Sequence, residues 1–181
     1  MGPWNIAHRG GALLRPENTL AAFADAVRRG CDGAELDVQL TRDGEVIVHH
    51  DHRLNPQLCR GPDGRWLAPP TPRLKDLALD ELRAFDVGRA DPSGGYARAH
   101  AGVSWRDDEC IPLLEEVIAV AKTARERFLL FVELKTSFSN RDEGASPEEL
   151  ARRTVAVLAM IFGRRIFPST FRAASASIAV S

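Results

Sequence analysis

Three carboxylates in two predicted strands carry the clearest chemical signal. Glu35 and Asp37 lie two positions apart in the alternating segment 33–40, so their side chains leave one face of a strand with Cα atoms roughly 6.5 Å apart. Glu133 adds a third acid in the apolar segment 128–135. Ionised carboxylates are costly inside a covered parallel sheet unless they are paired or metal-bound, and these three offer oxygen ligands suited to Mg²⁺ or Ca²⁺. For Glu35 and Asp37 alone, a solvated acidic face on an edge strand is the alternative.

Two histidines stand where parallel-sheet proteins place their sites. His8 and His50 each follow a predicted strand, at its C-terminal end. A lone histidine is more often structural, but two of them beside a carboxylate cluster favour general acid and base roles, since imidazole titrates near neutral pH. We interpret their neighbours His49 and His52 as surface or packing residues, because His49 points to the opposite face and His52 follows the strand.

The segment His-Arg-Gly-Gly is open to two interpretations. The guanidinium of Arg9 suits two oxygens of a phosphate, and Gly10 and Gly11 would let the backbone approach a ligand closely. Gly-Gly is equally common in simple turns, and arginine is common in surface ion pairs. These residues alone do not decide between a phosphate site and a turn.

Strands and helices alternate along the chain and must position these residues. The segment 41–45 predicts a hairpin turn. Three helix starts are predicted, at Asp80, at Pro112 and at a capping box of Ser146 and Glu149. Apolar periodicity predicts strands at 4–7, 33–40, 46–51 and 128–135 and helices at 20–27, 77–85, 112–124 and 147–161, with Leu113, Val117, Val120 and Ala121 along the buried stripe of the third helix.

The segment 52–104 is rich in proline, glycine and arginine, and we expect a long connection there instead of core. The alternation of strands and helices elsewhere indicates parallel βα units. A closed eightfold barrel takes at least about 200 residues, and a possible fifth strand near Ile166 is followed by small residues without periodicity. The expected fold is therefore α/β, without a choice among α/β folds from these patterns alone.

Bulk composition limits the classes of function. The chain has 181 residues, 44% of them apolar, and its 24 Lys and Arg balance 25 Asp and Glu. This composition predicts one globular domain over residues 1–181 and a small-molecule partner, and gives no basic field for nucleic acid. Cys31, Cys59 and Cys110 lack disulfide or zinc spacing and predict free thiols in a reducing compartment. No apolar run reaches the ~18 residues of a membrane span, so we expect a cytoplasmic location.

Taken together, these motifs carry a resemblance. "AHRGG", "RPENTLAAF", "GAELDVQLTRDGEVIVHHD", "IPLLEEVI" and "FVELK" occur in the order and spacing of the glycerophosphodiester phosphodiesterase family, over residues 5–136. The resemblance implies a TIM-type barrel, of which this chain would hold about the first half. It also implies a divalent metal held by Glu35, Asp37 and Glu133, an acid–base pair of His8 and His50, phosphate binding by Arg9 and Lys135, and a supporting role near the site for Glu17.

The reaction implied by the resemblance is cleavage of a glycerol phosphodiester to glycerol 3-phosphate and an alcohol. Which histidine is the acid, and whether water or a substrate hydroxyl attacks, stays open. Half a barrel leaves open sheet edges that favour self-association. An inactive truncated or frame-shifted fragment, suggested by the tail 171–181, is therefore an alternative. A related lysophospholipase D-type phosphodiesterase is another.

Overall fold

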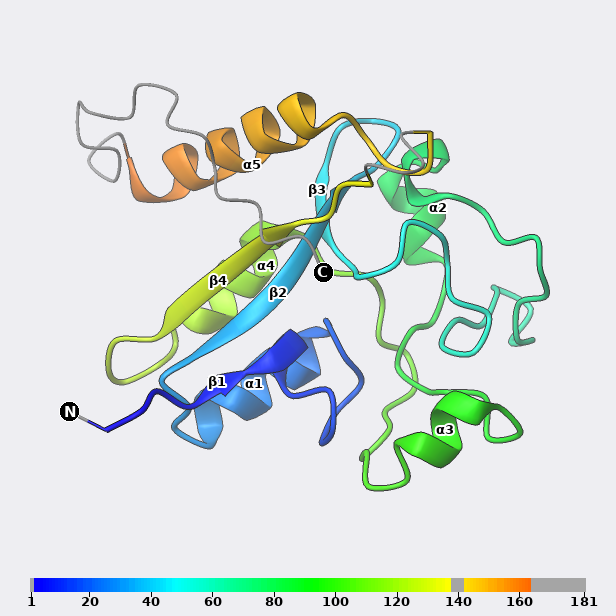
Figure 1. Ribbon diagram of the computed structural model, residues 1–181, viewed down its shortest axis with the longest axis horizontal. Helices are drawn as coiled ribbons and strands as arrows, with labels where there is room; N and C mark the ends of the chain where they lie inside the picture. Colours follow the sequence, from blue (N-terminus) through cyan, green and yellow to red (C-terminus); the bar gives the residue numbers. More distant parts are fainter. Residues whose placement is uncertain (1, 138–141, 164–181) are drawn as a thin grey trace.

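The computed structural model describes residues 2–137 and 142–163. The possible fifth strand near Ile166 and the tail after it lie outside the described residues. Within those limits, four strands form one sheet around β2 (Gly33–Leu40), which crosses the middle of the molecule (Figure 1).

Two parallel neighbours flank β2. The short β1 (Ile6–Ala7) pairs with its start, and β4 (Leu129–Leu134) pairs along the opposite edge, where Asp37 is the register partner of Glu133. The predicted hairpin is confirmed, because β3 (Val46–Val48) returns antiparallel to the second half of β2. The hairpin turn therefore lies beyond the end of β2, and β3 runs back from it alongside the second half of β2.

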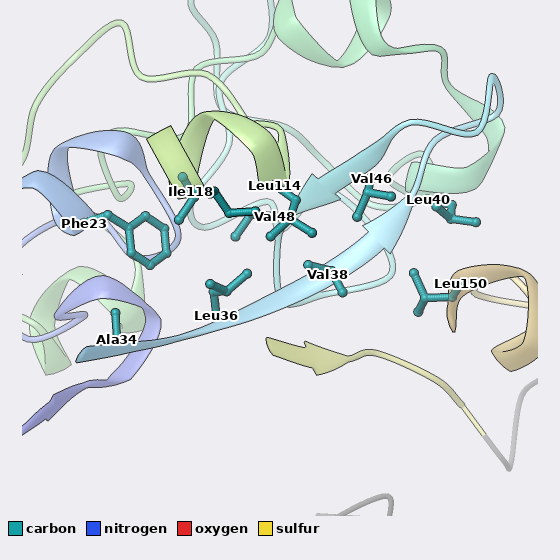
Figure 2. Packing of buried hydrophobic residues seen from close by; sticks show 11 residues of the cluster. Phe23, Ala34, Leu36, Val38, Leu40, Val46, Val48, Leu114, Ile118 and Leu150 are labelled. Atoms are coloured by element: carbon teal, nitrogen blue, oxygen red, sulfur yellow. The ribbon is translucent and has the colours of Figure 1, made fainter. Parts of the chain in front are cut away.

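The alternation in β2 separates two faces, as predicted. Ala34, Leu36 and Val38 are fully buried against the helices, and Figure 2 shows them in one cluster with side chains such as Phe23 and Leu114. Complete burial of one such leucine contributes about 1.5–3 kcal/mol. The helices on this face are α1 (Leu20–Arg28), α4 (Leu114–Ala121) and α5 (Pro147–Phe162). Glu35, Asp37 and Gln39 consequently leave the other face, which we call the inner face.

Apolar side chains near β4 remain exposed. Phe131 lies two residues before Glu133 in β4 and is 43% exposed, and the ring of Trp4, 62% exposed, is tilted against it with centroids 6.5 Å apart. Residues two apart in a strand share a face, so Phe131 lies on the inner face with the acidic side chains. No helix among the described residues is both long and apolar enough to cross a membrane.

Helix starts follow the prediction in part. Ser146 caps α5, where its hydroxyl accepts the Glu149 N–H at 3.2 Å and Pro147 occupies the first turn. The prediction that Asp80 starts its helix is wrong. The helix α2 (Leu79–Arg83) starts after Ala78, whose N–H donates to the Glu81 carboxylate at 2.7 Å.

The predicted start of α4 at Pro112 is also wrong. The carbonyl of Pro112 accepts the Val48 N–H at 2.8 Å, and Leu113 forms a bridge with Ile47, so both residues extend along β3. The helix begins only at Leu114. Its buried stripe is consequently shifted to Leu114, Val117 and Ile118, and of the predicted stripe only Val117 is fully buried.

The segment 52–104 is more than a connection, which corrects the prediction. It contains the short helices η2 (Leu74–Asp76), α2 and α3 (Gly95–Ala99) and supplies most of a second hydrophobic cluster. The leucines of this segment are spaced without helical or strand periodicity, so the sequence pattern does not predict this packing. The buried members of the cluster are Ile47, Leu54, Leu58, Cys59, Leu74, Leu82, Val87, Ala90 and Ile111.

Candidate functional site

The three predicted acidic residues converge on the inner face. One carboxylate oxygen each from Glu35, Asp37 and Glu133 lies within 4.8 Å of the other two. Asp37 is almost completely buried, whereas Glu35 and Glu133 are partly exposed. Three oxygens at this separation can surround one hard cation with bonds of about 2.0–2.6 Å. The donor set, oxygen only and acidic, fits Mg²⁺ or Ca²⁺ better than softer metals.

The electrostatics of this cluster favour a bound cation. Burial raises the pKa of Glu35, and the negative charges of Asp37 and Glu133 raise it further. A backbone hydrogen bond from Arg9 and the charge of His8 oppose this rise only in part. Burial and the two neighbouring acids thus both disfavour the ionised form of Glu35. A divalent cation would supply compensating positive charge.

The loop after β1 brings two predicted residues to the cluster. His8 Nε2 lies 3.8 Å from Glu35 Oε2 on an exposed side chain. Arg9 has a left-handed backbone, φ 50°, and its N–H donates to Glu35 Oε2 at 2.9 Å. Its guanidinium lies between Glu17, at 2.9 Å from Nη1, and Asp37, at 3.4 Å from Nε. A non-glycine residue in this conformation is uncommon and typical of functional sites.

The glycine beside Arg9 has a packing role. Gly10 has φ +76°, and a Cβ there would lie 2.9 Å from Ala22 Cβ and 3.1 Å from the Phe23 backbone. The missing Cβ of Gly10 therefore allows a close approach between the loop η1 (His8–Gly10) and α1. This packing holds Arg9 against the acidic side chains.

Lys135 completes the charged group from the side of β4. Its ammonium lies 2.8 Å from Glu133 Oε1 and 3.4 Å from Asp37 Oδ1. Its backbone N–H donates to the Val38 carbonyl, which continues the pairing of β4 with β2. Two cations, Arg9 and Lys135, thus approach the carboxylates from opposite sides of β2.

His50 reaches this region through the backbone. The N–H of His49 donates to the Asp37 carbonyl at 3.0 Å, so His50 follows directly after the last hairpin bond beside the cluster. Its ring Nδ1 lies 2.7 Å from Asp51 Oδ1. The packing role predicted for the neighbouring histidines fits the structure: His49 is buried, and His52 Nδ1 lies 2.7 Å from Gln39 Oε1.

Four further polar residues take part, and sequence reasoning missed them. The buried Asn18 donates to Asp37 Oδ2 at 2.8 Å, and the buried Gln39 holds the backbone after β3. Asp51 contacts His50, and the Tyr96 hydroxyl donates to Glu17 Oε2 at 2.5 Å. Gln39 could have been found, because it shares the face of Glu35 and Asp37. Tyr96 lies in an aperiodic segment that gives no such signal.

Comparison with known proteins identifies the family. The model of the glycerophosphoryl diester phosphodiesterase family matches residues 8–180. The chain belongs to this family. It is 40% identical over 132 residues to a glycerophosphodiester phosphodiesterase from Bacillus altitudinis. These residues make up 73% of this chain and 45% of the relative. A human relative, glycerophosphodiester phosphodiesterase 1, is 35% identical over 130 residues, which is 72% of this chain and 33% of that protein.

Solved structures share the fold. A structure from Silicibacter pomeroyi, named for the same family, superimposes with a TM-score of 0.79 at 29% identity and covers 88% of this chain and 55% of its own. A phosphodiesterase from Oleispira antarctica, in complex with the product sn-glycerol-3-phosphate, gives a TM-score of 0.61 at 28% identity over 93% and 54% of the two chains. The expected family and the TIM-type barrel fold are thus confirmed. The chain spans about half the length of these structures and less than half that of the curated relatives.

Proposed function

We propose that this chain carries the metal and phosphate site of an enzyme that hydrolyses glycerophosphodiesters to glycerol 3-phosphate and an alcohol. The observation that carries the proposal is the convergence of Glu35, Asp37 and Glu133 beside Arg9 and Lys135. A family relative with bound sn-glycerol-3-phosphate supports the substrate class. We further propose that residues 1–181 belong to one domain of this family.

Glu35, Asp37 and Glu133 would hold a divalent cation, Mg²⁺ or Ca²⁺. When bound, such a cation neutralises charge on phosphoryl oxygens as a Lewis acid. Arg9 and Lys135 would bind the phosphate. Arg9 Nε is buried and faces Asp37 Oδ2 at 3.4 Å, which places the guanidinium directly beside the proposed cation ligands. Glu17 holds the other side of the same guanidinium and supports this orientation.

His8 and His50 would transfer the protons. One imidazole removes a proton from the nucleophile, either water or a hydroxyl of the substrate, and the other protonates the leaving alkoxide. His8 is largely exposed beside Glu35, and His50 follows the hairpin bond at Asp37, so the two approach the cluster from different loops.

The test of this proposal separates chemistry from metal binding. We expect His8→Ala and His50→Ala each to abolish hydrolysis of glycerophosphocholine, a loss of about 100-fold or more, while calorimetric binding of Mg²⁺ or Ca²⁺ is retained. Asp37→Asn should weaken cation binding, and Glu115→Gln, at an exposed acid on α4, should not. Full activity in both histidine variants would contradict the assignment.

The substrates of the assay address the alternatives. Choline or ethanolamine release from glycerophosphodiesters supports the proposal, whereas preference for lysophospholipids supports the lysophospholipase D-type alternative. A folded, metal-binding chain without either activity supports an inactive fragment. The proposal includes a cytoplasmic location, in keeping with three free cysteines, and self-association through the edge of β4, where Phe131 is exposed.

A further inference from the structure

A chain of hydrogen bonds outside the carboxylate cluster fixes the ring of His50. Nδ1 of His50 lies 2.7 Å from Asp51 Oδ1, and Asp51 Oδ2 accepts a hydrogen bond from Asn55 Nδ2 at 2.9 Å. Asn55 Oδ1 in turn accepts the Gln57 N–H at 2.9 Å. Because a backbone N–H is always a donor, it identifies the amide oxygen of Asn55 and leaves the amide nitrogen for Asp51.

The backbone of the same loop is held from β2. Gln39, buried in the sheet, donates through Nε2 to the carbonyls of His49 and His50, each at 3.1 Å, and of Asp51 at 2.6 Å. The loop that carries His50 and Asp51 is therefore fixed at its backbone, and Asp51 is fixed again at its side chain by Asn55. Such double support is what a precisely oriented proton-transfer group requires.

We propose that Asp51 is a positioning residue that holds His50 in the Nδ1–H tautomer and so leaves Nε2 as the atom that exchanges protons. This inference rests on the proposed function only in that His50 then acts in the hydrolysis. An ionised carboxylate is solely an acceptor, so the nitrogen facing Asp51 must carry the proton. The hydrogen bond with His50 lowers the pKa of Asp51 to about 2, which keeps it ionised at neutral pH.

The decisive variant is Asp51→Asn, which preserves shape but can donate as well as accept. Because Asn55 presents its NH₂ group, the new amide must turn its oxygen to Asn55 and its own NH₂ group to the imidazole. His50 is then forced into the Nε2–H tautomer. We expect ¹⁵N spectra to show this reversal, with the His50 signal assigned by its loss in His50→Gln. For glycerophosphodiester hydrolysis we expect kcat to fall about tenfold or more, with KM nearly unchanged.

A double variant separates this role from a merely structural one. In Asp51→Asn with Asn55→Asp, the carboxylate at 55 accepts both the Gln57 N–H and the new amide NH₂, so the amide oxygen again faces the imidazole. The Nδ1–H tautomer should return, and kcat should recover in part. Asp63→Asn, in an exposed loop, is the matched control and should change neither quantity.

The tautomer decides the inference even if the chain has no hydrolytic activity. Absence of hydrolysis in the wild-type chain would defeat the proposed function, whereas the ¹⁵N spectra would still report the state of His50. Reversal in the single variant and return in the double variant support the inference. An unchanged Nδ1–H tautomer in Asp51→Asn, or a double variant that stays reversed, overturns it.

Discussion

At the scale of single residues, the site is a balance between buried acids and the donors around them. Asp37 is almost completely buried and interacts with Asn18, Arg9 and Lys135 at 2.8, 3.4 and 3.4 Å. A buried charge persists only when it is paired and hydrogen-bonded. Arg9 in turn is held by Glu17. The predicted site residues thus depend on one another, and on polar neighbours such as Asn18.

Tyr96 gives a test of this dependence. Its hydroxyl donates to Glu17, which orients Arg9. Tyr96→Phe removes that donor while keeping the ring that stacks on His100 at 3.9 Å. Because a hydrogen bond to a charged group contributes about 1.5–3 kcal/mol, we expect the Kd for glycerol 3-phosphate to rise about tenfold. Calorimetry measures it, with unchanged Mg²⁺ affinity as the internal control, and an unchanged Kd would refute a link from Tyr96 to Arg9.

The sequence predicted the charged residues because strand periodicity assigns them to a face. Glu35 and Asp37 are two apart, and their partner Glu133 is the only acid in the apolar segment 128–135. Tyr96 lacked any such signal, since its position depends on how an aperiodic segment packs. The role of Asp51 is not predictable from its place beside His50, because adjacency in sequence does not show which side chains form hydrogen bonds.

At the scale of elements, the loop η1 depends on its contact with α1. Gly10→Ala would put a methyl group 2.9 Å from Ala22 Cβ at φ +76°, whereas Gly64 has a similar φ of +74° and open space around it. A left-handed backbone costs either alanine about 1–2 kcal/mol. We expect Gly10→Ala to lose about 1–3 kcal/mol more than Gly64→Ala in urea unfolding, from overpacking. Equal losses of unfolding free energy in the two variants would show that the loop η1 accommodates the methyl group without a packing cost.

The hairpin introduces a pH dependence through His49. Burial lowers its pKa below the usual 6.5, so the unfolded chain binds the proton more readily than the folded one. Above about pH 6.5 the ring is neutral in both states, and the free energy of unfolding is unaffected. Below that pH the unfolded chain gains a proton, and the free energy of unfolding falls by at most about 1.4 kcal/mol per pH unit. We expect the difference in unfolding free energy between pH 7.5 and 5.5 to shrink in His49→Gln.

The matched control is His100→Gln, at a partly exposed ring on the segment after α3. It should leave that pH difference as in the wild type. If His49→Gln behaves like His100→Gln, the hairpin does not hold His49 neutral. His52, whose pKa burial also lowers, accounts for dependence that remains in His49→Gln.

The elements themselves were predictable where packing follows periodicity. The start of β2, the hairpin and the Ser146 cap are local signals and were correct. The start of α4 was misplaced because Pro112 and Leu113 bond to β3, a tertiary contact that overrides a helix signal. The second hydrophobic cluster was missed for a similar reason, since its members meet only after the segment 52–104 folds back on Ile47 and Ile111.

At the scale of the whole molecule, the sheet separates the helix-covered cluster from a charged inner face. The family and the barrel fold could be predicted from the order of the motifs. The sheet also carries the exposed Phe131 on the inner face, beside the site. The described strands therefore present the candidate metal ligands on a face that is open near β4.

The most direct measurement is ³¹P NMR of glycerophosphocholine incubated with the purified 181-residue chain and Mg²⁺ or Ca²⁺, alongside the solution mass of the same sample. We expect conversion of the diester signal to that of glycerol 3-phosphate, abolished by a chelator and restored by metal. A folded chain that binds the cation and leaves the diester intact would contradict it.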